Sequence, residues 1–200
     1  MKKALIIGGT GTIGSAVAKA LSTTHEILIA SRSSEYQVDL ASPTSIKALF
    51  DKVGTVDAVI ISAGAAHFGP LATMTPEDNL LSANNKLLGQ VNTVLIGKDY
   101  VADNGSFTLV TGIIMDEPIK DGASAAMANA GVKAFAKSAA TEMPRGIRIN
   151  TVSPTVLDES WSIYKDYFVG FETVSSNKVA NAFVKSVNGV QTGQSFTVYQ

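Results

Sequence analysis

The chain has 200 residues, a formal net charge of −1 and no cysteine. This length allows one domain with a substantial core, and 46% hydrophobic against 16% charged residues exclude a disordered chain. The near-zero charge gives little support to binding of nucleic acid or of an anionic membrane surface, and the absence of cysteine excludes disulfides and thiolate metal sites. We expect a single domain over residues 1–200, in the cytoplasm, with no metal, nucleic-acid or membrane partner.

The first predicted strand, Lys3–Ile7, runs directly into a glycine-rich loop and a helix over Thr12–Leu21. Strand, glycine loop and helix in this order are typical of a site for a dinucleotide pyrophosphate, because the free N–H groups and the positive end of the helix face the phosphates. An ordinary tight turn opening an α/β domain is the alternative. The predicted site comprises Gly8, Thr10, Gly11, Thr12, Ile13 and Gly14.

The second predicted strand, Glu26–Ala30, ends in Ser31, Arg32 and Ser33. In a dinucleotide fold this strand end meets the adenosine ribose, where an acidic residue favours NAD and an arginine pairs with the 2′-phosphate of NADP. No acidic residue lies within 29–34. The segment therefore favours NADP(H) over NAD(H), the alternative being a solvent-facing arginine at a strand end.

Strand and helix signals alternate along the rest of the chain. Ser42-Pro43 and Thr75-Pro76 are typical helix starts, with a hydroxyl cap and a proline in the first turn. Strand 58–62 is almost entirely apolar, as expected for a parallel strand covered on both faces. The pattern predicts an α/β fold, a three-layer doubly wound parallel sheet of about seven strands. The further strands are expected at 36–38, 58–62, 106–111, 148–152 and 195–199, and the further helices at 43–52, 76–103 (one helix or two), 123–142 and 175–187.

The widest irregular stretch is Pro154–Phe171, which is rich in aromatic residues and follows the end of a predicted strand. Ligands of open α/β sheets bind beyond the carboxyl ends of the strands. The stretch is therefore a candidate substrate lid, and a packed surface loop is the equal alternative.

Four segments resemble the short-chain dehydrogenase/reductase family, and the resemblance covers nearly the whole chain. They are the glycine loop, 38–40 (Val-Asp-Leu), 62–64 (Ser-Ala-Gly) and 146–154, which ends in Ser-Pro. The resemblance implies an NAD(P)-binding Rossmann fold. It also implies that Asp39 and Leu40 lie at the adenine, that Ser62, Ala63 and Gly64 run under the adenine end, and that Pro154 borders the nicotinamide.

The resemblance fails at the residues that carry the family's chemistry. Family enzymes use a tyrosine as acid or base, a lysine four residues later, a serine at the end of strand five and an asparagine in helix four. Alignment places Ala125, Asn129, Gly112 and Lys86 at these positions, with Thr111 beside the serine position. The chain thus resembles a divergent member that lacks the Tyr-x-x-x-Lys motif, in which the lysine and asparagine roles are exchanged between helices. The alternatives are a solvated lysine and a helix-packing asparagine.

The candidate catalytic residues are Lys86, Thr111 and Asn129, and a proton donor remains to be found among Thr111, Ser124, His67, Tyr164 and Tyr167. The expected function is that of an NADP(H)-dependent oxidoreductase acting on a small carbonyl or alcohol substrate. The alternatives are a non-catalytic NADP(H)-binding module or redox sensor, and an isomerase.

Small residues at 126, 130 and 134 in the helix predicted at 123–142 favour a homo-oligomer through the family's helices four and five, as is common in the family. Alternatively these alanines face the chain's own sheet.

Overall fold

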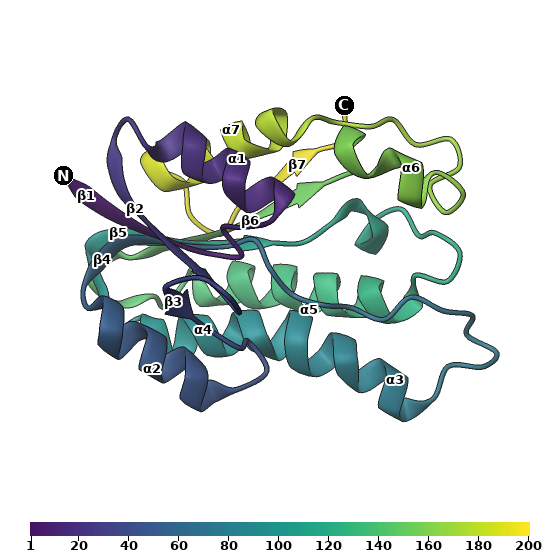
Figure 1. Ribbon diagram of the computed structural model, residues 1–200, viewed down its shortest axis with the longest axis horizontal. Helices are drawn as coiled ribbons and strands as arrows, with labels where there is room; N and C mark the ends of the chain where they lie inside the picture. Colours follow the sequence, from purple (N-terminus) through teal and green to yellow (C-terminus); the bar gives the residue numbers. More distant parts are fainter.

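A computed structural model describes residues Met1 to Gln200 and contains one sheet of seven parallel strands. The strands lie in the order β3-β2-β1-β4-β5-β6-β7 (Figure 1). The expected doubly wound parallel sheet is therefore confirmed. The strands are β1 (Lys2–Ile7), β2 (His25–Ser31), β3 (Tyr36–Gln37), β4 (Val56–Ile61), β5 (Val101–Val110), β6 (Arg148–Pro154) and β7 (Ser195–Val198).

Helices cover both faces of the sheet, as Figure 1 shows. The helices α1 (Thr12–Leu21) and α7 (Ser176–Asn188) lie side by side on one face. None of the helices combines the length and apolar character needed to cross a membrane. The other helices are α2 (Pro43–Val53), α3 (Pro76–Leu81), α4 (Gly89–Gly97) and α5 (Ala123–Ala139) on the second face, and the short α6 (Trp161–Tyr164) beyond the strand ends. Four further short segments are η1 (Ser82–Leu88, a π-helix) and the 3₁₀ turns η2 (Ile113–Met115), η3 (Pro144–Gly146) and η4 (Asp158–Ser160).

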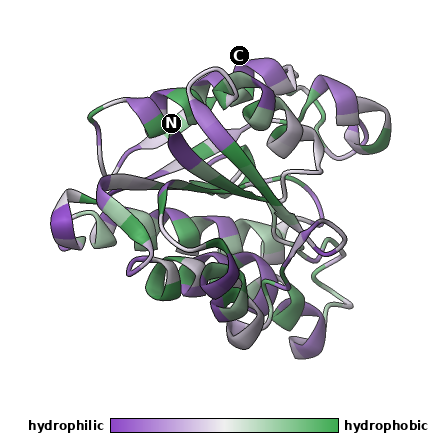
Figure 2. Cartoon of the chain, turned by 60° about the vertical axis from the view of Figure 1, so that its left-hand side comes forward, coloured by the Kyte–Doolittle hydropathy of each residue, from purple (hydrophilic) through white to green (hydrophobic).

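The apolar strands form a core on each side of the sheet. Alternate residues of β1 point to opposite faces, so Ile6 packs on the α1 and α7 side with Phe183, whereas Leu5 and Ile7 pack on the other side with Phe50. All five are at most 1% exposed, and burial of each such side chain stabilises the fold by roughly 1.5–3 kcal/mol. Figure 2 shows the apolar residues along the middle strands and polar residues on the outer turns of the helices.

The two predicted helix starts are confirmed. The hydroxyl of Ser42 accepts a hydrogen bond of 3.2 Å from the Ser45 N–H at the start of α2. At the start of α3 the hydroxyl of Thr75 accepts from the Asp78 N–H at 3.1 Å, and the Asp78 carboxylate accepts from the Thr75 N–H at 2.9 Å. These bonds satisfy donors that the first turn of a helix leaves unpaired.

The prediction of helix over residues 76–103 is wrong at its C-terminal end, and the observed helix is irregular in its middle. The helix is α3, then seven residues of π-helix, then α4, which ends at Gly97. A Cβ on Gly97 would lie 2.4 Å from the ring of Phe50, so only glycine allows this close contact with α2. The buried Val101 already belongs to β5 and pairs with Val56, a tertiary contact that apolar periodicity cannot reveal.

The chain leaves β1 toward β2 and β3, then returns to add β4 on the other side of β1. The loops that follow β1 and β4 therefore diverge above neighbouring strand ends. Ligands of open α/β sheets bind in the crevice that such a reversal creates.

Candidate functional site

Two cavities open at the carboxyl ends of the strands. We call the larger one, of about 310 Å³, the glycine-loop cavity. It is lined by Ile7, Gly8, Thr10, Gly11, Ser31, Arg32, Val38, Asp39, Leu40, Ser62, Ala63, Gly64, Ala65 and Asn85. We call the other one, of about 210 Å³, the apolar cavity. It is lined by Ile13, Phe68, Thr111, Gly112, Ile113, Ile114, Asn129, Pro154, Thr155, Val156, Leu157, Ser160, Tyr164 and Phe168.

The three spaced glycines differ in what surrounds them. Gly8 has φ +84°, and a Cβ there would lie 2.8 Å from the Cβ of Ala63. A Cβ on Gly14 would lie 2.2 Å from the carbonyl oxygen of Gly8, so this position packs helix against loop. Gly11 is different, because an added Cβ would touch only the Gly8 oxygen, at 3.4 Å, and a larger side chain would project into free space.

The start of α1 is open to an anion. Its N-cap is Gly11, which has no side chain, so no side-chain oxygen accepts from the N–H groups of the first turn. Thr12 and Gly14 belong to this turn but line neither of the two cavities, and Ile13 lines the apolar cavity. These free N–H groups and the helix dipole together favour a phosphate at the loop.

At the end of β2 the side chain of Arg32 lines the glycine-loop cavity and forms no ion pair. The Ser31 hydroxyl accepts from the N–H groups of Ser33, at 3.2 Å, and Ser34, at 3.0 Å, which holds the turn that presents Arg32. Ser33 does not line the cavity. An unpaired guanidinium at this place suits a bidentate phosphate contact.

The opposite wall of this cavity is held by backbone-directed hydrogen bonds. The Asp39 carboxylate accepts from the Ala41 N–H at 3.0 Å, and the Ser62 hydroxyl donates to the Ile7 carbonyl at 3.1 Å. Asn85, which the sequence analysis missed, accepts from the Ala65 N–H at 2.7 Å and fixes the loop after β4. No local signal sets Asn85 apart, because polar residues such as Asn79, Asn84 and Asn92 occur along the same helical run.

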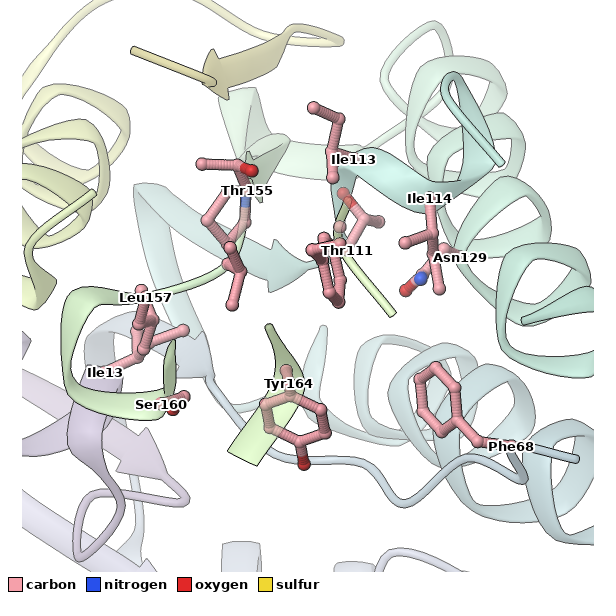
Figure 3. Close-up of a pocket in the computed structure, with 14 residues that line it drawn as sticks. Ile13, Phe68, Thr111, Ile113, Ile114, Asn129, Thr155, Leu157, Ser160 and Tyr164 are labelled. Atoms are coloured by element: carbon pink, nitrogen blue, oxygen red, sulfur yellow. The ribbon is translucent and has the colours of Figure 1, made fainter. Parts of the chain in front are cut away.

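The two cavities share the glycine loop, since residues 8, 10 and 11 line one cavity and Ile13 the other. An extended ligand lying along the start of α1 would therefore reach both. Pro154 lines the apolar cavity, and seven residues of the segment 154–171 form part of its wall. The phenol of Tyr164 is the one titratable group in that lining, and Figure 3 shows its hydroxyl turned away from Thr111 and Asn129.

The polar groups deep in the apolar cavity differ in their partners. Thr111 donates to the carbonyl of Val152 at 3.3 Å, and Thr155 donates to the carbonyl of Glu172 at 3.1 Å. Asn129 is 4% exposed, and its Oδ1 has no hydrogen-bond partner. Buried polar groups are otherwise nearly always paired, so this amide is an exception that calls for an explanation.

Lys86 lies behind the wall of the glycine-loop cavity and lines neither cavity. Its stem packs on Gly64, where an added Cβ would be 3.0 Å from the Lys86 Cδ. The residue sits in the π-helical turn, an irregularity often found at functional sites. Its ammonium forms no ion pair, and burial lowers the pKa of Lys86 to about 8. The structure thus brings Asn129 into the apolar cavity but leaves Lys86 outside it.

Three proton-donor candidates of the sequence analysis do not reach the cavities. Tyr167 and His67 line neither cavity, and the His67 ring covers Gly69, where an added Cβ would be 2.7 Å from its Nε2. The Ser124 hydroxyl is buried and lies 2.7 Å from both Asn79 Oδ1 and Ser82 Oγ. Ala125, which is expected at the family's tyrosine position, is 1% exposed.

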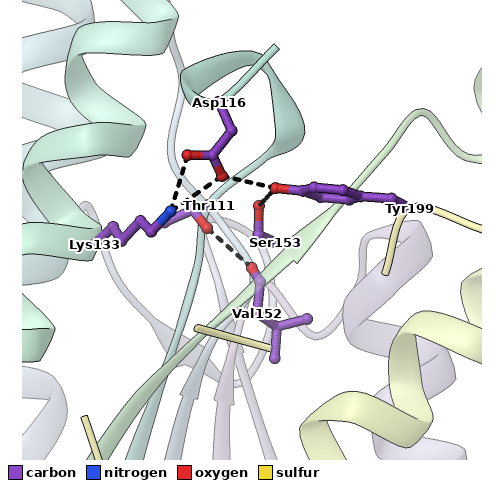
Figure 4. A network of polar contacts seen from close by, with 6 residues as sticks. All are labelled: Thr111, Asp116, Lys133, Val152, Ser153 and Tyr199. Carbon is purple, nitrogen blue, oxygen red and sulfur yellow. Dashed lines mark hydrogen bonds and ion pairs between the residues drawn. The ribbon is translucent and has the colours of Figure 1, made fainter. Parts of the chain in front are cut away.

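A polar network lies beside Thr111 (Figure 4). The Asp116 carboxylate accepts from Lys133 at 2.9 Å and from the Tyr199 hydroxyl at 2.9 Å, and that hydroxyl lies 3.2 Å from the Ser153 hydroxyl. The Lys133 ammonium lowers the pKa of Asp116, whereas burial raises the pKa of Tyr199 to about 12. Tyr199 therefore stays protonated and ties the end of β7 to the loop after β5.

A family model described as enoyl-(acyl carrier protein) reductase matches residues 9–187. No curated protein matches the sequence. Among solved structures, the protein lin1944 from Listeria innocua is 54% identical over 100% of both chains, with a TM-score of 0.98. A small-chain dehydrogenase is 26% identical over 99% of this chain and 96% of that one, with a TM-score of 0.85. Another, in complex with NADPH, is 24% identical over 99% and 97%, with a TM-score of 0.88.

Proposed function

Because the chain belongs to the short-chain dehydrogenase/reductase family, whose members are oxidoreductases, we propose that it uses NADP(H) to interconvert a small carbonyl compound and its alcohol. One observation carries this proposal. A single glycine loop joins a cavity that ends at an unpaired arginine to a cavity with apolar walls. The first suits the adenosine phosphate half of the cofactor, and the second suits the nicotinamide and a small substrate.

The residues present fit NADP(H). Gly11 leaves room for the pyrophosphate at the open start of α1, and Arg32 can pair with a 2′-phosphate. A fold neighbour that is 24% identical is itself in complex with NADPH. Thr10, Thr12, Gly14, Ser31 and Ser33 would complete the phosphate contacts. Asp39, Leu40, Ser62, Ala63 and Gly64 would border the adenosine, and Ile13 and Pro154 the nicotinamide.

Bound NADPH supplies a hydride to the substrate carbon. The chain's own residues orient the substrate, exclude water and place charge. The Thr111 hydroxyl donates to a backbone carbonyl and so keeps a lone pair for the cavity. Lys86, behind Gly64, adds positive charge near the cofactor without touching the substrate. Proton transfer would then depend on water or on a turn of the Tyr164 side chain into the cavity.

One observation favours a second function, that of an NADP(H)-binding module without catalysis. No ionisable group points into the apolar cavity, in line with the expectation that the buried Ala125 stands in place of the family's tyrosine. Such a module would bind both redox forms of the cofactor without turnover.

The experiment that separates the two functions measures binding and turnover in parallel. We expect NADPH fluorescence to titrate with a dissociation constant in the micromolar range, and NADPH to be oxidised in the presence of at least one small neutral aldehyde or ketone. Tight binding without oxidation by a broad panel of carbonyl compounds, and without NADP⁺ reduction by the alcohols, supports the binding module. Absence of NADPH binding contradicts both functions.

We also propose that the chain forms a homo-oligomer through α4 and α5. Ala130 and Ala134 are exposed and do not face the chain's own sheet, and Leu88, Leu95 and Met127, which belong to η1, α4 and α5, are 42% to 50% exposed. Small residues allow close helix approach, and exposed apolar side chains gain from burial. Sedimentation equilibrium at micromolar concentration should give a dimer or tetramer, and Ala130→Arg should shift it toward monomer. A monomeric mass for the parent chain contradicts this proposal.

A further inference from the structure

Asn129 is the one buried polar side chain in the lining of the apolar cavity that has no partner. Its residue is 4% exposed, its Oδ1 is enclosed without a hydrogen bond, and its Nδ2 donates to no residue. A Cβ on Gly112 would stand 3.5 Å from Nδ2, so the lack of a side chain at Gly112 leaves the amide open. Figure 3 shows this amide pointing into the cavity. An unpaired buried amide is unfavourable for folding, so its presence points to a bound partner.

The rest of the cavity restricts what that partner can be. Thr111 and Thr155 already donate to carbonyls of the chain, and no lysine, arginine, histidine, aspartate or glutamate lines the cavity. A carboxylate or phosphate placed there would lose its hydration without gaining a counter-charge. The walls are otherwise aliphatic and aromatic, so the occupant is uncharged with an apolar body.

We propose, resting on the proposed function, that the apolar cavity selects a small uncharged carbonyl compound or its alcohol, whose oxygen is held by the Asn129 amide. Because Oδ1 is enclosed, the contact is made by Nδ2, which donates to the carbonyl oxygen of the ketone or to the hydroxyl oxygen of the alcohol. In reduction the carbonyl carbon gains a hydride, the π pair moves to oxygen, and water supplies the proton, with NADPH as the reductant converted to NADP⁺. Oxidation of the alcohol is the reverse.

The size of the cavity sets the size of the substrate. Its volume of about 210 Å³, which the substrate would share with the nicotinamide, is below the roughly 300–1,000 Å³ typical of pockets that enclose drug-sized ligands. A ketone with one ring is of suitable size. Acetophenone is therefore the probe, with ethylbenzene as the analogue that lacks the oxygen and 4-acetylbenzoate as the analogue that adds a charge.

Binding is measured in the presence of NADP⁺, which cannot deliver a hydride, so that affinity is read apart from turnover. Saturation-transfer NMR detects each probe, and the fluorescence of Trp161, the single tryptophan, reports from α6 at the edge of the cavity. We expect acetophenone to bind at least about tenfold more tightly than either ethylbenzene or 4-acetylbenzoate. Ethylbenzene loses the hydrogen bond to the amide, and 4-acetylbenzoate brings a charge that finds no counter-charge in the cavity.

Asn129→Leu removes the amide and keeps a side chain of similar length. We expect this variant to bind acetophenone no better than ethylbenzene and to have a higher Tm, since an unpaired buried polar group is replaced by an apolar one. A merely structural asparagine would do the opposite, with a lower Tm and an unchanged preference for the ketone. Asn181→Leu, on the exposed face of α7, is the matched control and should change neither quantity.

The proposal is overturned if 4-acetylbenzoate binds as tightly as acetophenone, if acetophenone does not bind at millimolar concentration, or if Asn129→Leu keeps the preference for the ketone. Failure of the proposed function is distinct. In that case the three probes are discriminated as expected, yet no neutral carbonyl compound oxidises NADPH.

Discussion

The two cavities at the strand ends are built differently. The glycine-loop cavity depends on backbone groups and on the absence of side chains at Gly8 and Gly11, and it keeps the pattern of the family. The apolar cavity depends on side chains, and the sequence alignment predicts that Ala125, Asn129 and Gly112 stand at or near it in place of the family's tyrosine, lysine and serine. A loop that binds phosphate must let the phosphate come close to its backbone N–H groups, and almost any side chain prevents this. The catalytic properties of a site lined by side chains, in contrast, can be changed by single substitutions. Cofactor binding and catalysis can therefore diverge separately.

The largest expected effect is at Gly11. Gly11→Val should lower NADPH affinity at least about 100-fold, close to 3 kcal/mol, because the side chain fills the space where phosphate would lie. The fold should persist, since Gly11 has φ −83° and an added Cβ has only an ordinary contact. Fluorescence titration measures the affinity and circular dichroism the fold. Gly14→Ala is the contrasting variant and should destabilise the chain itself. Normal NADPH binding by Gly11→Val would mean that the phosphates lie elsewhere.

Lys86→Met tests the buried lysine behind the wall of the glycine-loop cavity. Burial lowers the pKa of Lys86 from 10.5 to about 8. Between pH 8 and pH 10.5 the unfolded chain therefore binds more protons than the folded chain, and the stability of the parent chain rises with pH over this range. The variant should therefore be more stable near neutral pH by at most roughly 3 kcal/mol, an upper bound because part of the side chain remains accessible. The gain should shrink as the pH approaches 10.5. Melts over a pH series measure it.

The same variant reports on function. Loss of the charge should weaken NADPH binding or slow turnover if Lys86 acts on the cofactor. An unchanged affinity and an unchanged rate would leave Lys86 with no part in the site. Lys137→Met, on the exposed face of α5, is a control for removal of a lysine.

Arg32→Ala tests whether the glycine-loop cavity sets the preference for NADPH over NADH. Loss of a charge-assisted contact should reduce NADPH affinity by about 1.5–3 kcal/mol, or roughly tenfold or more, and leave NADH affinity nearly unchanged. Parallel titrations with both cofactors at two salt concentrations measure this difference. Equal affinities in the parent chain, or an unaltered ratio in Arg32→Ala, would remove the basis for NADP(H) preference.

The smallest expected effect is in the network beside the apolar cavity. Asp116→Asn should lower stability near neutral pH by about 1 kcal/mol or less, because Asp116 and its partner Lys133 are 39% and 37% exposed. The pKa of Asp116 is lowered in the folded chain, so its contribution is present at neutral pH and is lost as the pH falls through that pKa. Denaturant melts at neutral and acidic pH should converge for parent and variant. A constant difference would show that charge is not involved.

Sequence periodicity predicted most of the fold, because seven short apolar runs alternating with amphipathic segments permit few arrangements other than a parallel sheet covered on both faces. It failed between 97 and 103, where a close contact with Phe50 and the pairing of Val101 with Val56 decide that the helix ends and a strand begins. Both are contacts between residues far apart in the chain, and they leave no local signal.

The amino-acid sequence by itself determined the glycine loop that is expected to bind phosphate. The sharp turn after β1, the room for a ligand at the backbone and the open start of α1 all depend on neighbouring residues between Ile7 and Gly14. Only the tertiary structure decided the contents of the apolar cavity. It places the unpaired amide of Asn129 beside Gly112, and it leaves His67 outside and Lys86 behind Gly64. These side chains come from separate elements, and their distances are set by how α5, the π-helical turn and the end of β5 pack together. A motif read along the chain cannot contain that information.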